Sequence, residues 1–173
     1  MQNNVIILIP IYKEHLSDTE SISLNRCLKV LSKYPICFVT FKMLNTKEYD
    51  TICKKYKVEM QKEYFDAYYF QNDLIGYNSL MLSKKFYKKF LKFTYLLIYQ
   101  LDAYVFRDDI EYWCNKHYSF IGGPVFEGYL KCNQNSLYLN CMNGGVSLRK
   151  TKDIYTLIKS INKIEIFENI YEK

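Results

Sequence analysis

The sequence predicts a single α/β domain with a central, mostly parallel or mixed sheet that is flanked by helices. Two observations support this class. The chain opens in the order strand, loop, capped helix and strand, which is a βαβ unit with a right-handed crossover. A second apolar run at residues 96–99 suits a strand that is covered on both faces, as in a parallel sheet. The length of 173 residues suits one domain, so we expect residues 1–173 to form one unit.

The opening unit depends on clear starting and stopping signals. Residues 5–9 are apolar and largely β-branched, and Pro10 should end this first strand because proline cannot donate to a ladder. Ser17 and Glu20 have the spacing of a capping box, so a helix should begin there. It should stop before the proline that precedes residues 36–41, the predicted second strand.

The middle of the chain predicts two more helices. Thr46 is expected to cap a helix that runs to about residue 56, and residues 58–65 follow as a third strand or extended segment. Another helix should open at Gly76 and carry lysines largely on one side: Lys84, Lys85, Lys88, Lys89 and Lys92. Such a charge run is more often a solvated helix face, and contact with anionic lipid is the alternative.

Asp102 is the first candidate for a ligand contact. It follows the apolar run at residues 96–99 and precedes a second apolar segment. A lone acid in such a place is costly to bury unless it is paired or bound to a cation. Ligands of open α/β sheets lie outside the carboxyl ends of strands. Asp102 is therefore either a ligand contact or a solvated acid at a strand end.

A short helix and a short strand are expected next. Asp108 or Asp109 can cap a helix at residues 110–116, which should bury Trp113. A short strand follows at residues 119–121.

The last part of the chain is rich in turn signals. Residues 122–124, Gly-Gly-Pro, predict a turn, and residues 125–140 show no periodicity, so we expect a long loop there. The glycine pair within residues 143–145 should lead into a short strand at residues 146–149. A helix is expected from Thr151.

Composition narrows the classes of partner and the compartment. The net charge of +6 comes mostly from lysines, which fits a phosphate-bearing ligand or an anionic membrane surface. The basic residues are scattered and match no nucleic-acid-binding motif, so we expect no nucleic-acid partner. The six cysteines form no Cys-x-x-Cys pair and only two histidines are present, which argues against a zinc site. No signal peptide or membrane span is apparent, and free thiols suit a cytoplasmic protein.

An ordered set of short motifs resembles one protein family along nearly the whole chain. The motifs, in chain order, are residues 5–20 with 10–14 at their centre, residues 23–41, Gly76-Tyr77-Asn78 with Met81-Leu82-Ser83, residues 99–103, Trp113-Cys114, Ile121-Gly122 and residues 143–149. The set is similar to a bacterial family first catalogued as a domain of unknown function. That family looks like GT-A type glycosyltransferases and is found among proteins of cell-surface polysaccharide synthesis.

The resemblance implies roles for particular residues. The nucleotide pocket would be lined by Pro10, Ile11, Tyr12, Lys13 and Glu14, with Asn78 also near the nucleotide. In this interpretation Tyr12 stacks on the base and Glu14 bonds the ribose or base. The sugar and acceptor side would be formed by Gly122, Gly123, Asn143, Gly144, Gly145 and Arg149.

The resemblance also implies a divalent metal, Mn²⁺ or Mg²⁺, held by Asp102, which would be the catalytic residue as well. A carboxylate suits such a hard cation. Gln100 stands where the usual GT-A metal motif has its first acid. The family pattern continues to a C-terminal acidic pair that Glu165 and Glu168 do not match, so a C-terminally truncated domain is expected.

Two functions are compatible with the sequence. The first is transfer of a sugar from a nucleotide-sugar donor to a glycan or lipid-linked acceptor in cell-surface polysaccharide synthesis. The alternative is a non-catalytic GT-A-like module that binds a nucleotide, a glycan or a partner protein. For either function we expect a cytoplasmic protein in peripheral contact with the anionic inner face of the inner membrane, through its lysine-rich helix.

Overall fold

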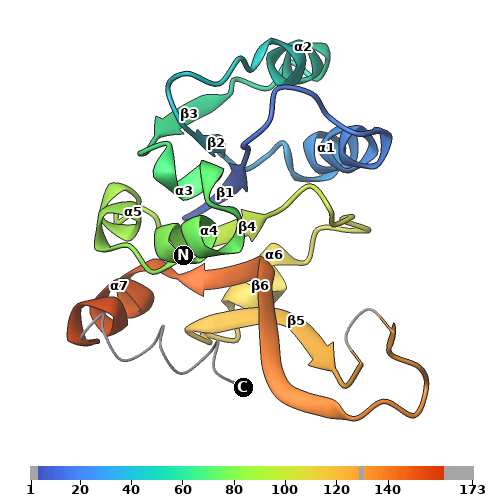
Figure 1. Ribbon diagram of the computed structural model, residues 1–173, viewed down its shortest axis with the longest axis vertical. Helices are drawn as coiled ribbons and strands as arrows, with labels where there is room; N and C mark the ends of the chain where they lie inside the picture. The colour runs from blue at the N-terminus through green and yellow to red at the C-terminus, as the bar shows by residue number, and fades with distance from the viewer. Residues whose placement is uncertain (1–3, 129–130, 162–173) are drawn as a thin grey trace.

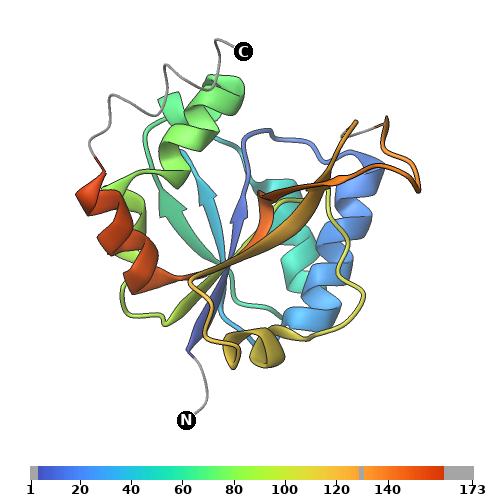
Figure 2. The same ribbon diagram turned by 90° about the horizontal axis from the view of Figure 1, so that it is seen from below.

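The computed structural model describes residues 4–128 and 131–161, which build a mixed six-stranded sheet with helices on both faces (Figures 1 and 2). The strand order is β3-β2-β1-β4-β6-β5. The strands are β1 (Val5–Pro10), β2 (Ile36–Thr40), β3 (Gln61–Tyr64), β4 (Tyr95–Tyr99), β5 (Phe120–Phe126) and β6 (Tyr138–Lys150). The first four are parallel, whereas β6 is antiparallel to both β4 and β5. The predicted fold class is confirmed.

Each face of the sheet has its own core. The helices α1 (Asp18–Leu31), α2 (Lys47–Lys55) and α6 (Ile110–Cys114) pack on one face. The other face is covered by α3 (Tyr68–Gln71), α4 (Asp73–Met81), α5 (Lys84–Lys89) and α7 (Thr151–Ser160) (Figure 2). In β1, Ile7 and Ile9 face the first core and Ile6 and Leu8 the second, as the two-residue period of a strand requires. Burial on both faces explains why β1 is apolar throughout.

The capping box of α1 is confirmed. The Ser17 backbone N–H donates to Glu20 Oε2 at 2.8 Å, and the Glu20 backbone N–H donates to Ser17 Oγ at 3.3 Å. Thr46 occupies the N-cap position of α2 as expected, but its hydroxyl donates to Asp50 Oδ2 at 3.0 Å and accepts no backbone N–H of the helix. The Lys47 backbone N–H donates to Asn45 Oδ1 at 3.2 Å.

The single lysine-rich helix expected from Gly76 is also wrong. The chain forms α4, which begins at Asp73, and a separate α5 of six residues. The break falls at Ser83, whose backbone is extended (φ −82°, ψ 125°), and the Met81 carbonyl at the end of α4 accepts a hydrogen bond from the Tyr87 hydroxyl at 3.0 Å. One of the lysines of α5, Lys89, forms an ion pair with Glu63.

The expected turn at residues 122–124 is instead part of β5. Pro124 is tolerated there because β5 is an edge strand. The expected long loop is shorter, since β5 extends to Phe126 and β6 starts at Tyr138. The glycine pair at residues 144–145 lies inside β6, where the register with β5 shifts between Gly122 and Gly123.

Burial of Trp113 was wrongly predicted. The Trp113 side chain is 43% exposed, and α6 buries Ile110 and Cys114 in its place. Glu165 and Glu168 lie outside the described residues. Within residues 4–128 and 131–161, no helix combines the length and the apolar character needed to cross a membrane.

Candidate functional site

A cavity of about 360 Å³ lies beyond the carboxyl ends of β1 and β4. These neighbouring parallel strands flank the point where the strand order reverses, because β2 and β3 extend to one side of β1 and β4 lies on the other. Open α/β sheets bind ligands at such a switch point. The cavity size falls within the range of small-molecule sites.

The β1 side of the cavity is lined by Pro10, Ile11, Tyr12 and Lys13. Tyr12 is 58% exposed, and Lys13 Nζ lies over its ring at 5.9 Å from the centroid. The loop after β1 is held in place by Tyr49, whose hydroxyl donates to the Lys13 carbonyl at 2.9 Å.

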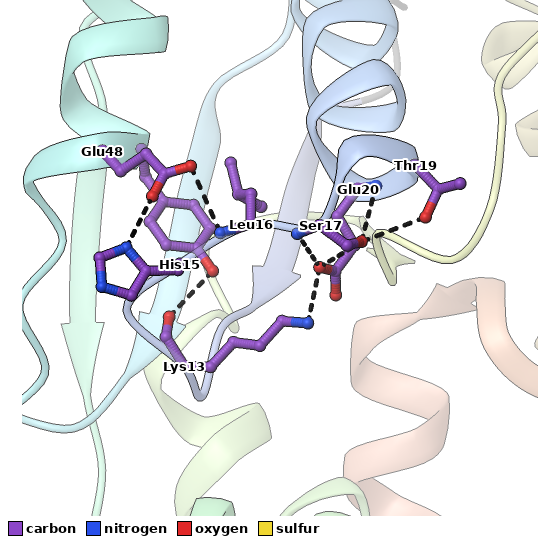
Figure 3. A network of polar contacts seen from close by, with 8 residues as sticks. Lys13, His15, Leu16, Ser17, Thr19, Glu20 and Glu48 are labelled. Atoms are coloured by element: carbon purple, nitrogen blue, oxygen red, sulfur yellow. Dashed lines mark hydrogen bonds and ion pairs between the residues drawn. The ribbon is translucent and has the colours of Figure 1, made fainter.

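An ion pair crosses this wall, with Lys13 Nζ 2.7 Å from Glu20 Oε2 (Figure 3). The hydrogen bond to Glu20 raises the pKa of Lys13 above its ordinary value. Burial alone would raise the pKa of Glu20, but the hydrogen bonds from Lys13 and Ser17 outweigh it, so the pKa of Glu20 is lowered. Both groups are therefore charged at neutral pH, and Glu20 serves both the helix cap and the cavity wall.

The β4 side is lined by Gln100, Leu101 and Asp102, and Asp102 is exposed. The loop that follows is tied to α1. The Arg26 guanidinium donates to the Val105 carbonyl at 2.9 Å and to the Phe106 carbonyl at 2.5 Å. These contacts fix the backbone close to Asp102, so the β4 side of the cavity is in place before a ligand binds.

The third wall comes from α3 and α4 and was not predicted from the sequence. It consists of Tyr69, Phe70, Asp73, Leu74 and Tyr77. Asp73 and Tyr77 are four residues apart on α4 and thus share one side of that helix. That spacing was visible in the sequence, but the helix was expected to start only at Gly76, after Asp73.

Tyr77 has an unusual environment. Its hydroxyl is buried and has no hydrogen-bond partner among the described residues, although the Gln100 side chain approaches it. Burial raises the pKa of Tyr77 to about 12, while the positive charge of Arg149 and the approach of Gln100 act in the opposite direction.

The structure brings only part of the predicted site to the cavity. Pro10, Ile11, Tyr12, Lys13 and Asp102 line it. The residues that do not line it are Glu14, Asn78, Gly122, Gly123, Asn143, Gly144, Gly145 and Arg149.

Gly145 stands directly behind the lining. Its carbonyl accepts from the Gln100 backbone N–H at 3.0 Å. A Cβ added at Gly145 would lie 2.5 Å from Gln100 Oε1, so the glycine permits the close approach of β6 to the cavity wall.

The cavity offers oxygen ligands of the kind that Mg²⁺ and Mn²⁺ prefer, from the carboxylates of Asp73 and Asp102. Among the described residues, no three His, Cys, Asp or Glu side chains are grouped to hold a metal by themselves. This donor set fits a cation held by one or two carboxylates and completed by phosphate oxygens, which is the usual mode for Mg²⁺.

A family model described as "Protein of unknown function (DUF5672)" matches residues 59–173. The chain belongs to this family. The matched region includes the α3–α4 wall, Asp102 and the bulged strand β6, so much of the cavity belongs to the DUF5672 region. No curated protein matches the sequence.

The DUF5672 chain is similar in fold to core-mannan synthase A from Aspergillus fumigatus, solved in an Mn/GDP form. The TM-score is 0.52 and the sequence identity is 13%. The match covers 72% of this chain and 43% of the synthase chain. The DUF5672 chain therefore has a glycosyltransferase-like fold of the GT-A type and spans less than half the length of this structural relative.

Proposed function

We propose that this domain is a glycosyltransferase domain that binds a nucleotide-sugar donor in the cavity beyond β1 and β4. The observation that carries the proposal is the position of the cavity, which joins the exposed Tyr12 ring and the Asp102 carboxylate at the switch point of the sheet. The similar fold of a mannan synthase solved with Mn and GDP supports the same ligand class.

Each wall would contact a different part of the donor. The face of Tyr12 would stack on the base, since an exposed aromatic ring at a cavity rim suits a flat heterocycle. Asp102 would hold the diphosphate end through a divalent cation, together with Asp73 if both carboxylates reach it. When bound, this cation supplies Lewis-acid stabilisation of the negative charge that grows on the nucleoside diphosphate leaving group.

The charge of the cavity supports dependence on a cation. Its lining has one ammonium, from Lys13, and three carboxylates, from Glu20, Asp73 and Asp102, which leaves two negative charges in excess. An anionic diphosphate would be repelled by this lining unless a divalent cation offset the charge.

The wider context belongs to the proposal as well. The acceptor would be a glycan or a lipid-linked glycan, in keeping with the family resemblance. A cytoplasmic domain would reach a lipid-linked acceptor through peripheral contact with an anionic membrane, by way of the exposed lysines of α5.

A thermal-shift screen of nucleoside diphosphates and nucleotide-sugars, with and without Mn²⁺, tests the function. A ligand at 100 times its dissociation constant adds about 2.7 kcal/mol to the free energy of unfolding, which raises the Tm of a domain of this size by roughly 5–10 °C. We expect one nucleotide to stabilise the protein in a metal-dependent manner and its nucleotide-sugar to be turned over. Binding without turnover would favour the non-catalytic module, and no response to any nucleotide would contradict the proposal.

A further inference from the structure

Arg149 is a buried cation without a carboxylate partner among the described residues. Only 6% of its surface is exposed, although arginine is almost never buried unless it is paired. Its guanidinium donates to three neutral oxygens: Ser147 Oγ at 2.9 Å, the Tyr87 hydroxyl at 2.6 Å and the Gly144 carbonyl at 3.3 Å. It also lies over the Phe120 ring, 5.3 Å from the centroid. These contacts satisfy hydrogen bonds but do not neutralise the charge.

The positive charge lies behind the α4 wall of the cavity. Tyr87 links Arg149 to the Met81 carbonyl at the end of α4, the helix that presents Asp73 and Tyr77 to the cavity. Ser147 donates to the Gly144 carbonyl at 2.9 Å, next to Gly145, which holds the Gln100 backbone. The charge of Arg149 also reaches Tyr77 itself, since it acts on the pKa of that hydroxyl.

The two sides of the cavity therefore differ in what lies behind them. Asp73 and Asp102 place one carboxylate in the lining of the α4 side and of the β4 side, respectively, and the buried guanidinium of Arg149 lies behind the α4 side without an ion-pair partner among the described residues. A buried charge is screened little by solvent, so its field extends into a cavity with low-dielectric walls. An anion in the cavity would supply the counter-charge that the fold does not give to Arg149.

We propose that Arg149 is a positioning residue that selects an anionic diphosphate group and draws it to the Tyr77 side of the cavity. The guanidinium does not line the cavity, so it acts through the electrostatic field of its charge. The identity of the diphosphate as part of a nucleotide rests on the proposed function. The selection of a diphosphate by the positive charge of Arg149 does not rest on the proposed function, because inorganic pyrophosphate has the same charged group.

The test measures the binding of three ligands to the wild type, Arg149→Gln and Arg149→Lys: a nucleoside, its diphosphate and inorganic pyrophosphate. The glutamine variant removes the charge and keeps a hydrogen-bonding side chain, whereas lysine keeps the charge. We expect Arg149→Gln to weaken the diphosphate and pyrophosphate about tenfold or more and to leave the nucleoside unchanged. Arg149→Lys should retain most of the preference for the charged ligands.

Different outcomes separate this inference from the proposed function. If the wild type binds the nucleoside diphosphate and Arg149→Gln binds it equally well, the inference is wrong and the proposed function stands. If only pyrophosphate binds and Arg149→Gln weakens it, the inference stands without the nucleotide. A purely structural role would weaken the nucleoside and the charged ligands alike, and would overturn the inference.

Circular dichroism and thermal melting establish whether the variants are folded. Tyr87→Phe is the matched structural control, since it removes a partner of Arg149 and keeps the charge. It should lower the Tm and leave the preference for charged ligands intact. If Arg149→Gln does not fold, thermal melting of the wild type with pyrophosphate is the test. The inference requires that pyrophosphate stabilise the wild type. If pyrophosphate fails to stabilise it both with and without Mn²⁺, the inference is wrong.

Discussion

At the scale of single residues, the proposed metal contact depends most on Asp102. Asp102→Asn keeps the size of the side chain and removes its charge, so metal-dependent binding of the nucleotide should weaken by at least about tenfold. Calorimetric titration with and without Mn²⁺ measures this change. Asp109→Asn is a matched control, because Asp109 lies in the same loop, pairs with Arg107 and does not line the cavity. Equal metal dependence in both variants would remove Asp102 from the site.

Glu20 makes a prediction about pH. The pKa of its carboxyl is lowered from its ordinary value of 4.5 in the folded protein, because the effect of burial is outweighed by the hydrogen bonds from Lys13 and Ser17. A lowered pKa contributes stability that is present above the unfolded pKa and is lost as pH falls through the folded pKa. Glu20→Gln keeps a side chain suited to the capping box but cannot carry the charge. Denaturant unfolding should therefore show a wild-type advantage at pH 7 that shrinks below about pH 4.5. An advantage that is independent of pH would show that the charge of Glu20 plays no part.

At the scale of elements, two adjacent glycines of β5 should respond differently to replacement by alanine. A Cβ at Gly122 would lie 2.4 Å from the Asn143 carbonyl oxygen, whereas a Cβ at Gly123 would meet nothing within 4 Å. Gly122→Ala should therefore cost about 1–3 kcal/mol of unfolding free energy by forcing β5 from β6. Gly123→Ala should stay within about 0.5 kcal/mol of the wild type. Urea unfolding of both variants checks this, and equal stabilities would contradict the close β5–β6 contact.

The same elements show what could be predicted from the sequence. The run at residues 5–9 and the capping box of α1 were predicted because their signals are local. Residues 122–124 were expected to form a turn because Gly-Gly-Pro is a local breaker signal. Pairing with a strand about twenty residues later overrides that signal, and this partner is not visible in the local pattern.

The residues of the candidate site likewise include some that the sequence indicated and some that it did not. Asp102 was proposed because it follows an apolar strand, and Tyr12 was proposed from the family resemblance. Both line the cavity, because the parallel strands β1 and β4 are neighbours. Asp73 and Tyr77 were missed because the helix was expected to start at Gly76, although Asn72 is of a residue type favoured at the N-cap position that it occupies. Arg149 is buried by contacts within its own strand β6 and with α5 and β5, which no local pattern indicates.

At the scale of the whole molecule, the proposed membrane contact is α5, which packs on the face of the sheet opposite α2. Each lysine near an anionic leaflet contributes about 1 kcal/mol, so binding should be reversible and should be lost at high salt. Sedimentation with anionic and neutral vesicles measures it. Binding should fall when three exposed lysines of α5 are changed to glutamine: Lys84, Lys85 and Lys88. The matched control changes three exposed lysines of α2: Lys47, Lys54 and Lys55.

If the two triple variants bind anionic vesicles equally well, or if neutral vesicles bind as strongly, the lysines of α5 are an ordinary solvated surface. That result would leave the cavity and its ligand unaffected.

A crystal structure of the protein with Mn²⁺ and the nucleoside diphosphate selected by the thermal-shift screen tests the central claim most directly. Anomalous scattering locates the manganese independently of the nucleotide density. The account predicts a manganese peak coordinated by Asp102, the base against Tyr12 and the diphosphate on the Tyr77 side of the cavity. A nucleotide bound away from the carboxyl ends of β1 and β4, or a manganese with no contact to Asp102, would contradict it.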